Sequence, residues 1–160
     1  MSIWAALAGG FVGTLILTTG LRAANAANLT RIDLPFLLGT AFTTNRTRAK
    51  ALGYGVHFVD GQIFALLYYA VFAAIGYSSW WLGTVFGLVH GLFAATALVN
   101  ILLPLIHPRM GTLHTSAPDV ALLEPPGFLM LNYGRSTPAV TLAAHLAYGT
   151  VVGGFLAWPD

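Results

Sequence analysis

The sequence predicts an all-α membrane protein in which four transmembrane helices pack as one bundle. Hydrophobic residues make up 57% of the 160 residues and charged residues only 8%, whereas an ordinary soluble domain carries about 25% charged residues. Three long segments, 1–21, 61–108 and 136–159, contain no Asp, Glu, Lys or Arg. The alternation of apolar and polar residues that is typical of a membrane barrel is absent. Together these observations favour membrane helices.

The charge-free segments are long enough for four spans, because a helix needs about 20 apolar residues to cross the bilayer core. The first and last segments each accommodate one helix. The central segment, extended toward residue 52, accommodates two helices, since the turn-like cluster 76–79 separates them. The predicted spans are 3–22, 52–75, 80–106 and 137–158, and they form a single integral membrane domain.

The basic residues predict the orientation of this domain. All of them lie in or beside the loops 23–51 and 107–136, which a four-span arrangement places on one side of the membrane. By the positive-inside rule that side is cytoplasmic, so both termini are extracytoplasmic. The four tryptophans fall at the opposite end, where interfacial aromatic residues are expected. They are Trp4, Trp80, Trp81 and Trp158.

Two apolar stretches interrupt the predicted cytoplasmic loops. Each of the segments 32–38 and 120–131 combines apolar side chains with one acid and with proline. Such a stretch is able to lie in the headgroup layer as a short interfacial segment. The alternative is that each stretch packs back on the bundle.

Composition and motifs exclude several functional classes. Seven Lys and Arg residues are too few for a nucleic-acid-binding face. Without cysteine there is no disulfide, thiolate metal site or cysteine nucleophile. The chain also lacks a P-loop, G-x-S-x-G, H-E-x-x-H and the dinucleotide-binding glycine pattern. The sequence therefore predicts no catalytic residues.

A short motif occurs twice. His57-Phe58-Val59-Asp60-Gly61 and His145-Leu146-Ala147-Tyr148-Gly149 both read His-x-x-polar-Gly, and each follows a glycine-rich helix and a long loop. This pattern indicates two helix–loop–helix repeats of the same topology, related by an axis along the membrane normal. Such an axis would make His57 and His145 a symmetric pair.

The polar residues of the spans are expected at a common depth. Counting about 1.5 Å per helical residue places His57, Asp60, Asn100 and His145 in one layer about 8–13 Å below the cytoplasmic surface. Tyr148 is the polar position of the second motif. His90 is expected to be separate, about 25 Å from the cytoplasmic end of its helix, as a buried, hydrogen-bonded residue.

Three hypotheses account for this layer. In the first, its side chains hydrogen-bond between helices and only stabilise the bundle. In the second, His57 and His145 bind haem, another tetrapyrrole or a metal ion, with Asp60 as a third metal ligand. In the third, Asp60 and the histidines relay protons or bind a small ion or solute, because an intramembrane acid commonly marks a transport pathway.

Glycines at a spacing of four predict close helix packing, because they let two backbones approach. One such face is alternatively a surface for a partner protein. The pattern occurs three times, at Gly9 and Gly13, at Gly87 and Gly91, and at Gly149 and Gly153.

Several of these residues together resemble a known group of proteins. They are Asp33-Leu34-Pro35, His57 with Gly61, the Gly83–Gly91 segment running to Pro104, and His145-x-x-Tyr148-Gly149. The pattern resembles small bacterial four-helix membrane proteins, including the YagU-like and related families of unknown function. The resemblance implies a bacterial inner-membrane bundle and no particular activity. It marks His57, His145 and Tyr148 as polar positions of the pattern, but not Asp60.

We expect a non-catalytic membrane subunit or accessory protein. Small size, the lack of an extramembrane domain and the glycine patterns favour this function, with the lipid bilayer and other membrane subunits or a second copy as partners. The alternatives are a haem-, tetrapyrrole- or metal-binding protein using His57 and His145, and a small proton or solute transporter centred on Asp60.

Overall fold

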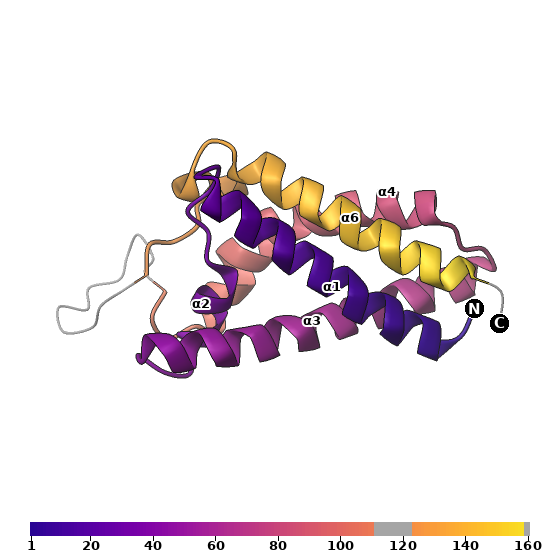
Figure 1. The fold of residues 1–160 in the computed structure, drawn as a ribbon, viewed down its shortest axis with the longest axis horizontal. Coiled ribbons are helices and arrows are strands. Elements are labelled where there is room, and N and C mark those ends of the chain that lie inside the picture. Colours follow the sequence, from indigo (N-terminus) through magenta and orange to yellow (C-terminus); the bar gives the residue numbers. More distant parts are fainter. Residues whose placement is uncertain (111–122, 159–160) are drawn as a thin grey trace.

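The computed structural model describes residues 1–110 and 123–158. Four helical segments in it are long and apolar enough to cross a membrane. They are α1 (Ile3–Ala26), α3 (Arg46–Ile75), the continuous segment Trp80–Ile106 and α6 (Thr137–Ala157). They pack side by side, and both termini lie at the same end of the bundle (Figure 1). The prediction of an all-α, multi-pass four-helix bundle is confirmed.

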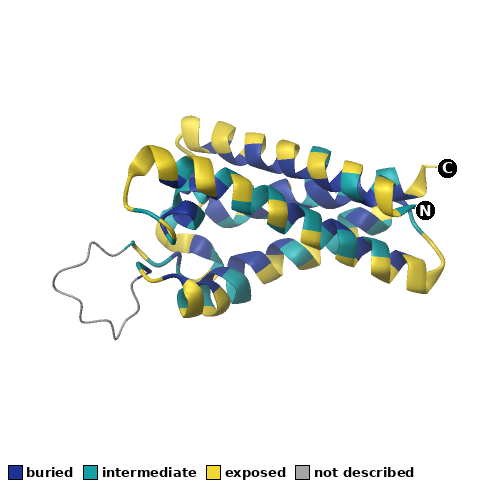
Figure 2. Cartoon of the chain, turned by 90° about the horizontal axis from the view of Figure 1, so that it is seen from below, coloured by how far each residue is buried: buried dark blue, intermediate teal, exposed yellow. Residues whose placement is uncertain are grey.

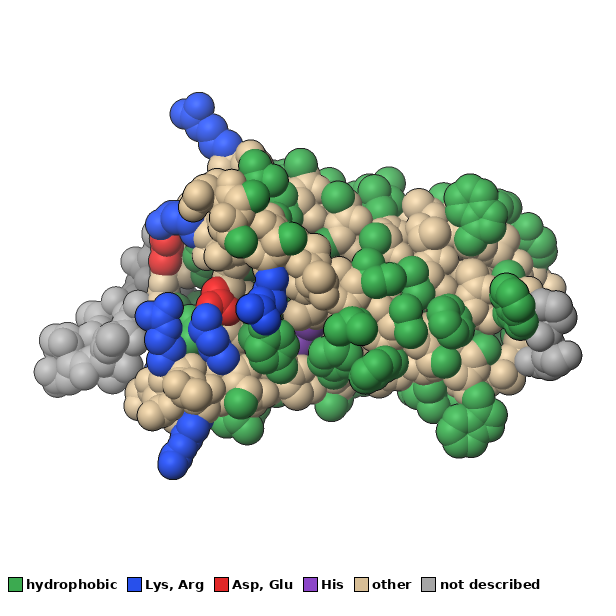
Figure 3. Space-filling view, viewed as in Figure 1, with side chains coloured by type: hydrophobic (Ala, Val, Ile, Leu, Met, Phe, Trp, Pro, Cys, Tyr) green, Lys and Arg blue, Asp and Glu red, His purple; other side chains and the backbone are tan. Residues whose placement is uncertain are grey.

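The two ends of the bundle differ in chemistry, as the sequence predicts. Lys and Arg side chains gather at one end of the face in Figure 3, and the four tryptophans belong to helix ends at the other. We call these the basic end and the tryptophan end. Trp4 and Trp158 are each 76% exposed, which suits aromatic rings at a membrane interface.

Helices α1 and α3 extend further toward the basic end than predicted. α1 continues past residue 22 to Ala26, and α3 begins at Arg46 rather than at residue 52. Charged residues end the apolar pattern but not the helix, and Asn45 caps α3 by accepting a hydrogen bond from the Arg48 amide at 3.0 Å. The 30 residues of α3 span about 45 Å, more than the hydrocarbon core requires.

A short helix, α2 (Leu34–Gly39), occupies the first predicted loop. Its first turn is capped by Asp33, which accepts a hydrogen bond from the Phe36 amide at 3.2 Å. α2 packs directly on α3, because a Cβ atom added at Gly53 would lie only 1.7 Å from the carbonyl oxygen of Pro35. Of the two interpretations of segment 32–38, the structure therefore favours packing on the bundle.

The second loop segment follows a similar course where it is described. Residues 120–122 of the segment 120–131 lie outside the described residues. The remainder includes the 3-10 helix η2 (Phe128–Tyr133), which contacts η1 and α6. This loop therefore also packs on the bundle over its described part.

The third span is not a regular α-helix. It consists of α4 (Trp80–Phe93), the π-helix η1 (Ala94–Leu102) and α5 (Leu103–Ile106). The π-helical hydrogen bonding precedes Pro104, which lacks an amide hydrogen. The side-chain amide of Asn100 donates to the carbonyls of Thr96 at 2.9 Å and Ala95 at 3.3 Å, within the same segment. Asn100 thus supports its own irregular helix.

Glycines also allow close approach between pairs of the long helices. Between α4 and α6, a Cβ added at Gly149 would lie 2.1 Å from the carbonyl oxygen of Gly83. Between α1 and α6, a Cβ at Gly13 would lie 2.9 Å from the Tyr148 ring. Between α1 and α3, a Cβ at Gly61 would lie 1.9 Å from the Thr14 hydroxyl oxygen. All six glycines of the repeated spacing lie close to a neighbouring helix, so that an added Cβ would come within 3.0 Å of it: Gly9, Gly13, Gly87, Gly91, Gly149 and Gly153.

Aromatic rings, rather than glycines, fill the space between α3 and α4. The ring centroids of Phe64 and His90 lie 3.7 Å apart, and those of Phe72 and Phe86 lie 5.1 Å apart. A two-fold repeat would make the α3–α4 contact equivalent to the close α1–α6 contact. The two contacts differ because only α1–α6 has glycines at its crossing, so the symmetric packing expected from the repeat is wrong.

The outer faces of the four helices are apolar and exposed, while a buried stripe faces inward (Figure 2). Phe11, Leu67, Val89 and Ile101 are each more than half exposed. Such a surface suits lipid as the surrounding solvent.

Candidate functional site

A cavity of about 480 Å³ lies within the membrane-spanning part of the bundle. Its walls come from α1, α3, α4, η1, α5 and α6 and from the short elements at the basic end. This volume falls within the range of about 300–1,000 Å³ that is typical of ligand sites. Most of the lining is apolar, and the polar side chains on it are Thr14, His57, Asp60, His90, Thr141, His145 and Tyr148.

Three histidines from three different helices line this cavity. They are His57 of α3, His90 of α4 and His145 of α6. The rings of His90 and His145 meet edge to face with their centroids 4.7 Å apart. Gly87 and Gly91 allow this approach, since a Cβ at Gly91 would lie 2.9 Å from the Cβ of His145. The contact glycines of α4 therefore set the position of His90.

The hydrogen bonds of these histidines are incomplete. The Nδ1 atom of His145 lies 2.8 Å from the carbonyl oxygen of Thr141, so Nδ1 carries a proton and donates it. In a neutral ring this leaves the lone pair on Nε2. His57 Nε2 and His90 Nδ1 are buried and have no hydrogen-bond partner among the described residues. Such atoms are uncommon in folded proteins and call for a specific explanation.

Tyr148 and Asp60 are among the other polar side chains that line the cavity. The hydroxyl of Tyr148 donates to the carbonyl oxygen of Gly61 at 2.5 Å, which joins the second copy of the repeated motif to the first. Asp60 is half-buried, and within the described ranges its carboxyl group has neither a hydrogen bond nor an ion pair. The cavity therefore contains an acid and imidazoles that the protein itself does not fully satisfy.

The structure brings together most, but not all, of the residues that the sequence singled out. His57, Asp60, His145 and Tyr148 line one cavity. Asn100 does not line it, because its amide is used inside η1. The expectation that Asn100 joins a hydrogen-bonded layer between helices is therefore wrong.

His90 is the functional candidate that sequence reasoning missed. Counting regular helical residues from the basic end placed it too deep, because the intervening π-helix has a wider turn and advances less per residue. The expectation that His90 is separate and hydrogen-bonded is wrong, since its ring contacts that of His145 and its buried Nδ1 has no hydrogen-bond partner among the described residues. The pattern Gly87-x-x-His90-Gly91 contained the relevant signal, because a residue beside a contact glycine lies close to the neighbouring helix.

The predicted metal site is not assembled. Within residues 1–110 and 123–158, no group of three or more His, Asp or Glu side chains is placed to hold a metal ion. His57, Asp60 and His145 share a cavity without converging on one point. In addition, the ring that contacts His145 is that of His90, so the symmetric His57–His145 pair is replaced by a three-histidine arrangement.

Comparison with known proteins assigns no family to this chain. No family model matches it, and no curated protein and no solved structure is significantly similar. The resemblance to YagU-like families stays a prediction, and the function must be argued from the cavity.

Proposed function

We propose that this chain is a membrane-embedded binding protein that holds an apolar, membrane-dissolved ligand in the cavity lined by His57, His90 and His145. The observation that supports this proposal is the placement of His57 and His90 in an apolar cavity, each with a ring nitrogen that has no hydrogen-bond partner in the described part of the chain. Each buried polar atom without a partner costs about 1–3 kcal/mol. A ligand with an apolar body and a polar group supplies the missing partner and fills the cavity.

The test compares two tryptophan substitutions on the same helical segment. Leu98 of η1 lines the cavity, whereas Ile101 is 61% exposed and does not line it. Leu98→Trp should fill the cavity, and Ile101→Trp should only enlarge the outer surface. After purification in mild detergent, bound compounds are extracted with organic solvent and measured by mass spectrometry. The wild type and Ile101→Trp should retain a compound that Leu98→Trp loses. Identical extracts from all three proteins would contradict the proposal.

A tetrapyrrole such as haem is a second candidate for this ligand, and the hydrogen bond of His145 favours it. A histidine that binds a metal commonly donates its other ring N–H to a backbone carbonyl, as His145 Nδ1 does to Thr141. Its Nε2 atom would then be the axial ligand. Protein purified from haem-supplied cells should show a Soret band that His145→Ala removes. If the wild type shows no Soret band and contains no porphyrin, this candidate is wrong and the apolar-ligand proposal is unaffected.

The other two functions stay predictions. An accessory subunit should migrate with a larger complex, or with a second copy, when native membranes are solubilised mildly. A transporter centred on Asp60 should lose its activity in Asp60→Asn. The feature that supports the transporter is the Asp60 carboxyl group in the cavity, which is unpaired within residues 1–110 and 123–158.

A further inference from the structure

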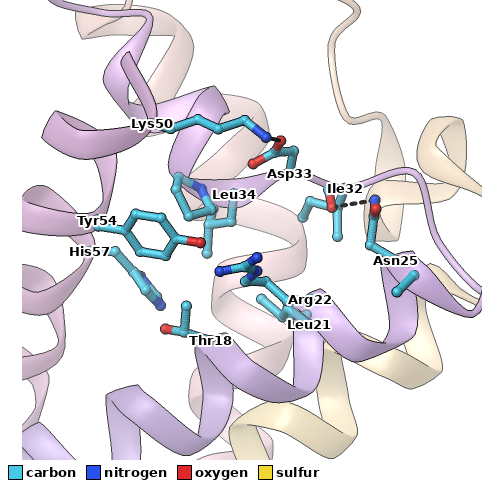
Figure 4. A pocket seen from close by; sticks show the side chains of 12 residues that line it. Thr18, Leu21, Arg22, Asn25, Ile32, Asp33, Leu34, Lys50, Tyr54 and His57 are labelled. Carbon is cyan, nitrogen blue, oxygen red and sulfur yellow. Dashed lines mark hydrogen bonds and ion pairs between the residues drawn. The ribbon is translucent and has the colours of Figure 1, made fainter. Parts of the chain in front are cut away.

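A second pocket, of about 400 Å³, lies at the basic end between α1, α2 and α3. We call it the headgroup pocket. Figure 4 shows the side chains of Thr18, Arg22, Tyr54 and His57 pointing toward one another across it. These residues come from α1 and α3, and the first turn of α2 closes one side. The pocket is therefore a polar, cationic recess at the place where the apolar helix surface ends.

The charged side chains of the headgroup pocket differ in whether they have an oppositely charged partner. Lys50 Nζ lies 2.6 Å from Asp33 Oδ2, and Asp33 Oδ1 caps the first turn of α2. The carboxylate is thus neutralised within the protein. The guanidinium carbon of Arg22 lies 6.0 Å from the centre of the Tyr54 ring, and Arg22, an exposed residue, has no ion pair in the described part of the chain. The pocket therefore carries one unneutralised positive charge.

The headgroup pocket adjoins the cavity described above. Leu21, Ile32, Leu34 and His57 line both of them. One molecule with an anionic group at one end and an apolar chain at the other is therefore able to occupy both, with the chain directed into the membrane-spanning part. An exclusively apolar ligand would leave the charge of Arg22 without a partner.

We propose that the headgroup pocket binds the phosphate anion of an acidic lipid, whose apolar chain enters the cavity. This inference rests on the proposed binding function and names the class of ligand. Arg22 is the principal contact, because a guanidinium group pairs well with phosphate oxygens. The ammonium group of Lys50 and the hydroxyl group of Tyr54 are further donors on the pocket wall.

The experiment measures lipid retention in full-length protein purified in mild detergent and supplied with equal amounts of phosphatidylglycerol and phosphatidylcholine. Native mass spectrometry gives the ratio of the two bound lipids. The wild type should prefer phosphatidylglycerol by about fivefold, the effect expected of about one basic residue acting on an anionic headgroup. Arg22→Gln should bring the ratio close to one, and Arg22→Lys should preserve part of the preference.

Arg48→Gln is the matched control. Arg48 is exposed at the same end but lies outside the headgroup pocket, so its loss should leave the ratio unchanged. A wild-type ratio of one, or an equal fall of the ratio in Arg48→Gln, would overturn the inference. A wild-type ratio of one would mean that the pocket does not select an anionic headgroup, and an equal fall in Arg48→Gln would reflect only the general charge of the basic end.

Two further measurements complete the experiment. One distinguishes failure of this inference from failure of the proposed function, and the other distinguishes a lipid ligand from a soluble phosphate. If Leu98→Trp lowers the retention of both lipids while the wild type shows no preference, the apolar cavity binds ligand and the headgroup inference is wrong. If Leu98→Trp changes neither the amount of lipid retained nor the preference for phosphatidylglycerol, the apolar chain of the lipid does not enter the cavity and both proposals fail. Glycerol 3-phosphate should not displace the lipid at equal concentration, and full displacement would indicate a soluble phosphate site instead.

Discussion

The hydroxyl group of Tyr148 in α6 donates a hydrogen bond to the carbonyl oxygen of Gly61 in α3, with 2.5 Å between the two oxygens. Tyr148 is only 1% exposed, and its ring covers Gly13 of α1. One side chain thus connects three helices beside the cavity. Because Gly61 is also a point at which α3 packs against Thr14 of α1, this hydrogen bond forms beside the contact between α1 and α3.

The first prediction concerns this hydrogen bond. Tyr148→Phe keeps the ring but removes the donor, so the free energy of unfolding should fall by about 0.6 kcal/mol, with about 1.7 kcal/mol as the upper limit for such bonds in membrane helices. Unfolding by SDS titration of the protein in mixed micelles measures the change. Tyr69→Phe is the control, because Tyr69 packs against the same core without a hydrogen bond in the part of the chain that the structure describes. Equal losses in both variants would contradict the prediction.

The second prediction concerns the contact between α4 and α6. Gly149→Ala places a methyl group against the backbone of α4, 2.1 Å from the Gly83 carbonyl oxygen, so the helices must separate. The loss should lie at or above the upper end of the 1–3 kcal/mol typical of overpacking. Gly20→Ala is the control, since no atom lies within 4 Å of its added Cβ. Thermal unfolding in detergent should show a lower transition temperature for Gly149→Ala alone.

The third prediction concerns the side of the membrane on which each loop lies. The chain has no cysteine, so Thr44→Cys, Arg135→Cys and Tyr77→Cys each introduce a single label site, and all three positions are exposed. An impermeant maleimide applied from the extracytoplasmic side should label Cys at 77 only. The other two should react only after the membrane is opened, because the basic end is expected in the cytoplasm. Labelling of 44 and 135 from different sides would contradict the four-span topology.

The fourth prediction concerns the effect of pH on Tyr133, the last residue of η2. Burial, then the nearby Glu124, raises the pKa of Tyr133 to about 12, while Arg31 acts in the opposite direction. The Tyr133 hydroxyl donates to the Glu124 carbonyl oxygen at 2.7 Å. In the unfolded state a tyrosine has a pKa of about 10. Between about pH 10 and pH 12 the Tyr133 hydroxyl is therefore ionised in the unfolded state but still protonated in the folded state. Stability is therefore unaffected by Tyr133 below pH of about 10 and falls as the pH rises toward 12.

Tyr133→Phe removes this ionisation. The transition temperature of the variant should consequently fall less than that of the wild type over the same alkaline range. The comparison must be made between the two proteins at each pH, because every ionisable group other than Tyr133 is the same in both. Parallel curves for the two proteins would show that Tyr133 contributes nothing to the alkaline dependence.

Much of the architecture follows from local properties of the chain. The charge-free segments predict four spans, and the break at Gly76 coincides with the left-handed cap that ends α3, where φ is +74°. The start of α6 at Thr137 also agrees with the prediction. These features are predictable because lipid requires each span to satisfy its own backbone hydrogen bonds, whatever its neighbours are. The starts and ends in the loops are less predictable, since a helix such as α3 continues past the membrane surface.

The candidate site was likewise predictable only in part. Residue type and approximate depth bring His57, Asp60, His145 and Tyr148 into consideration, and the structure places all four on one cavity. The sequence predicts Asn100 in the polar layer and His90 outside it, whereas in the structure His90 contacts His145 and Asn100 is hydrogen-bonded within its own helix. The reason is that the π-helix of the third span changes the depth of these residues and the direction in which they face. A count along one sequence cannot detect that change, since the hydrogen bonding of η1 is irregular.

By itself the sequence determined that lipid surrounds most of this protein, how many times the chain crosses the membrane, and which end is basic. Each of these depends on composition over about twenty residues. Only the tertiary structure decided which helices approach through their glycines, that α3 and α4 are separated by aromatic rings, and that a cavity with three histidines adjoins a pocket at Arg22. These features depend on the register between helices. That register is set by close contacts between residues of different helices, which the composition of one segment does not reveal.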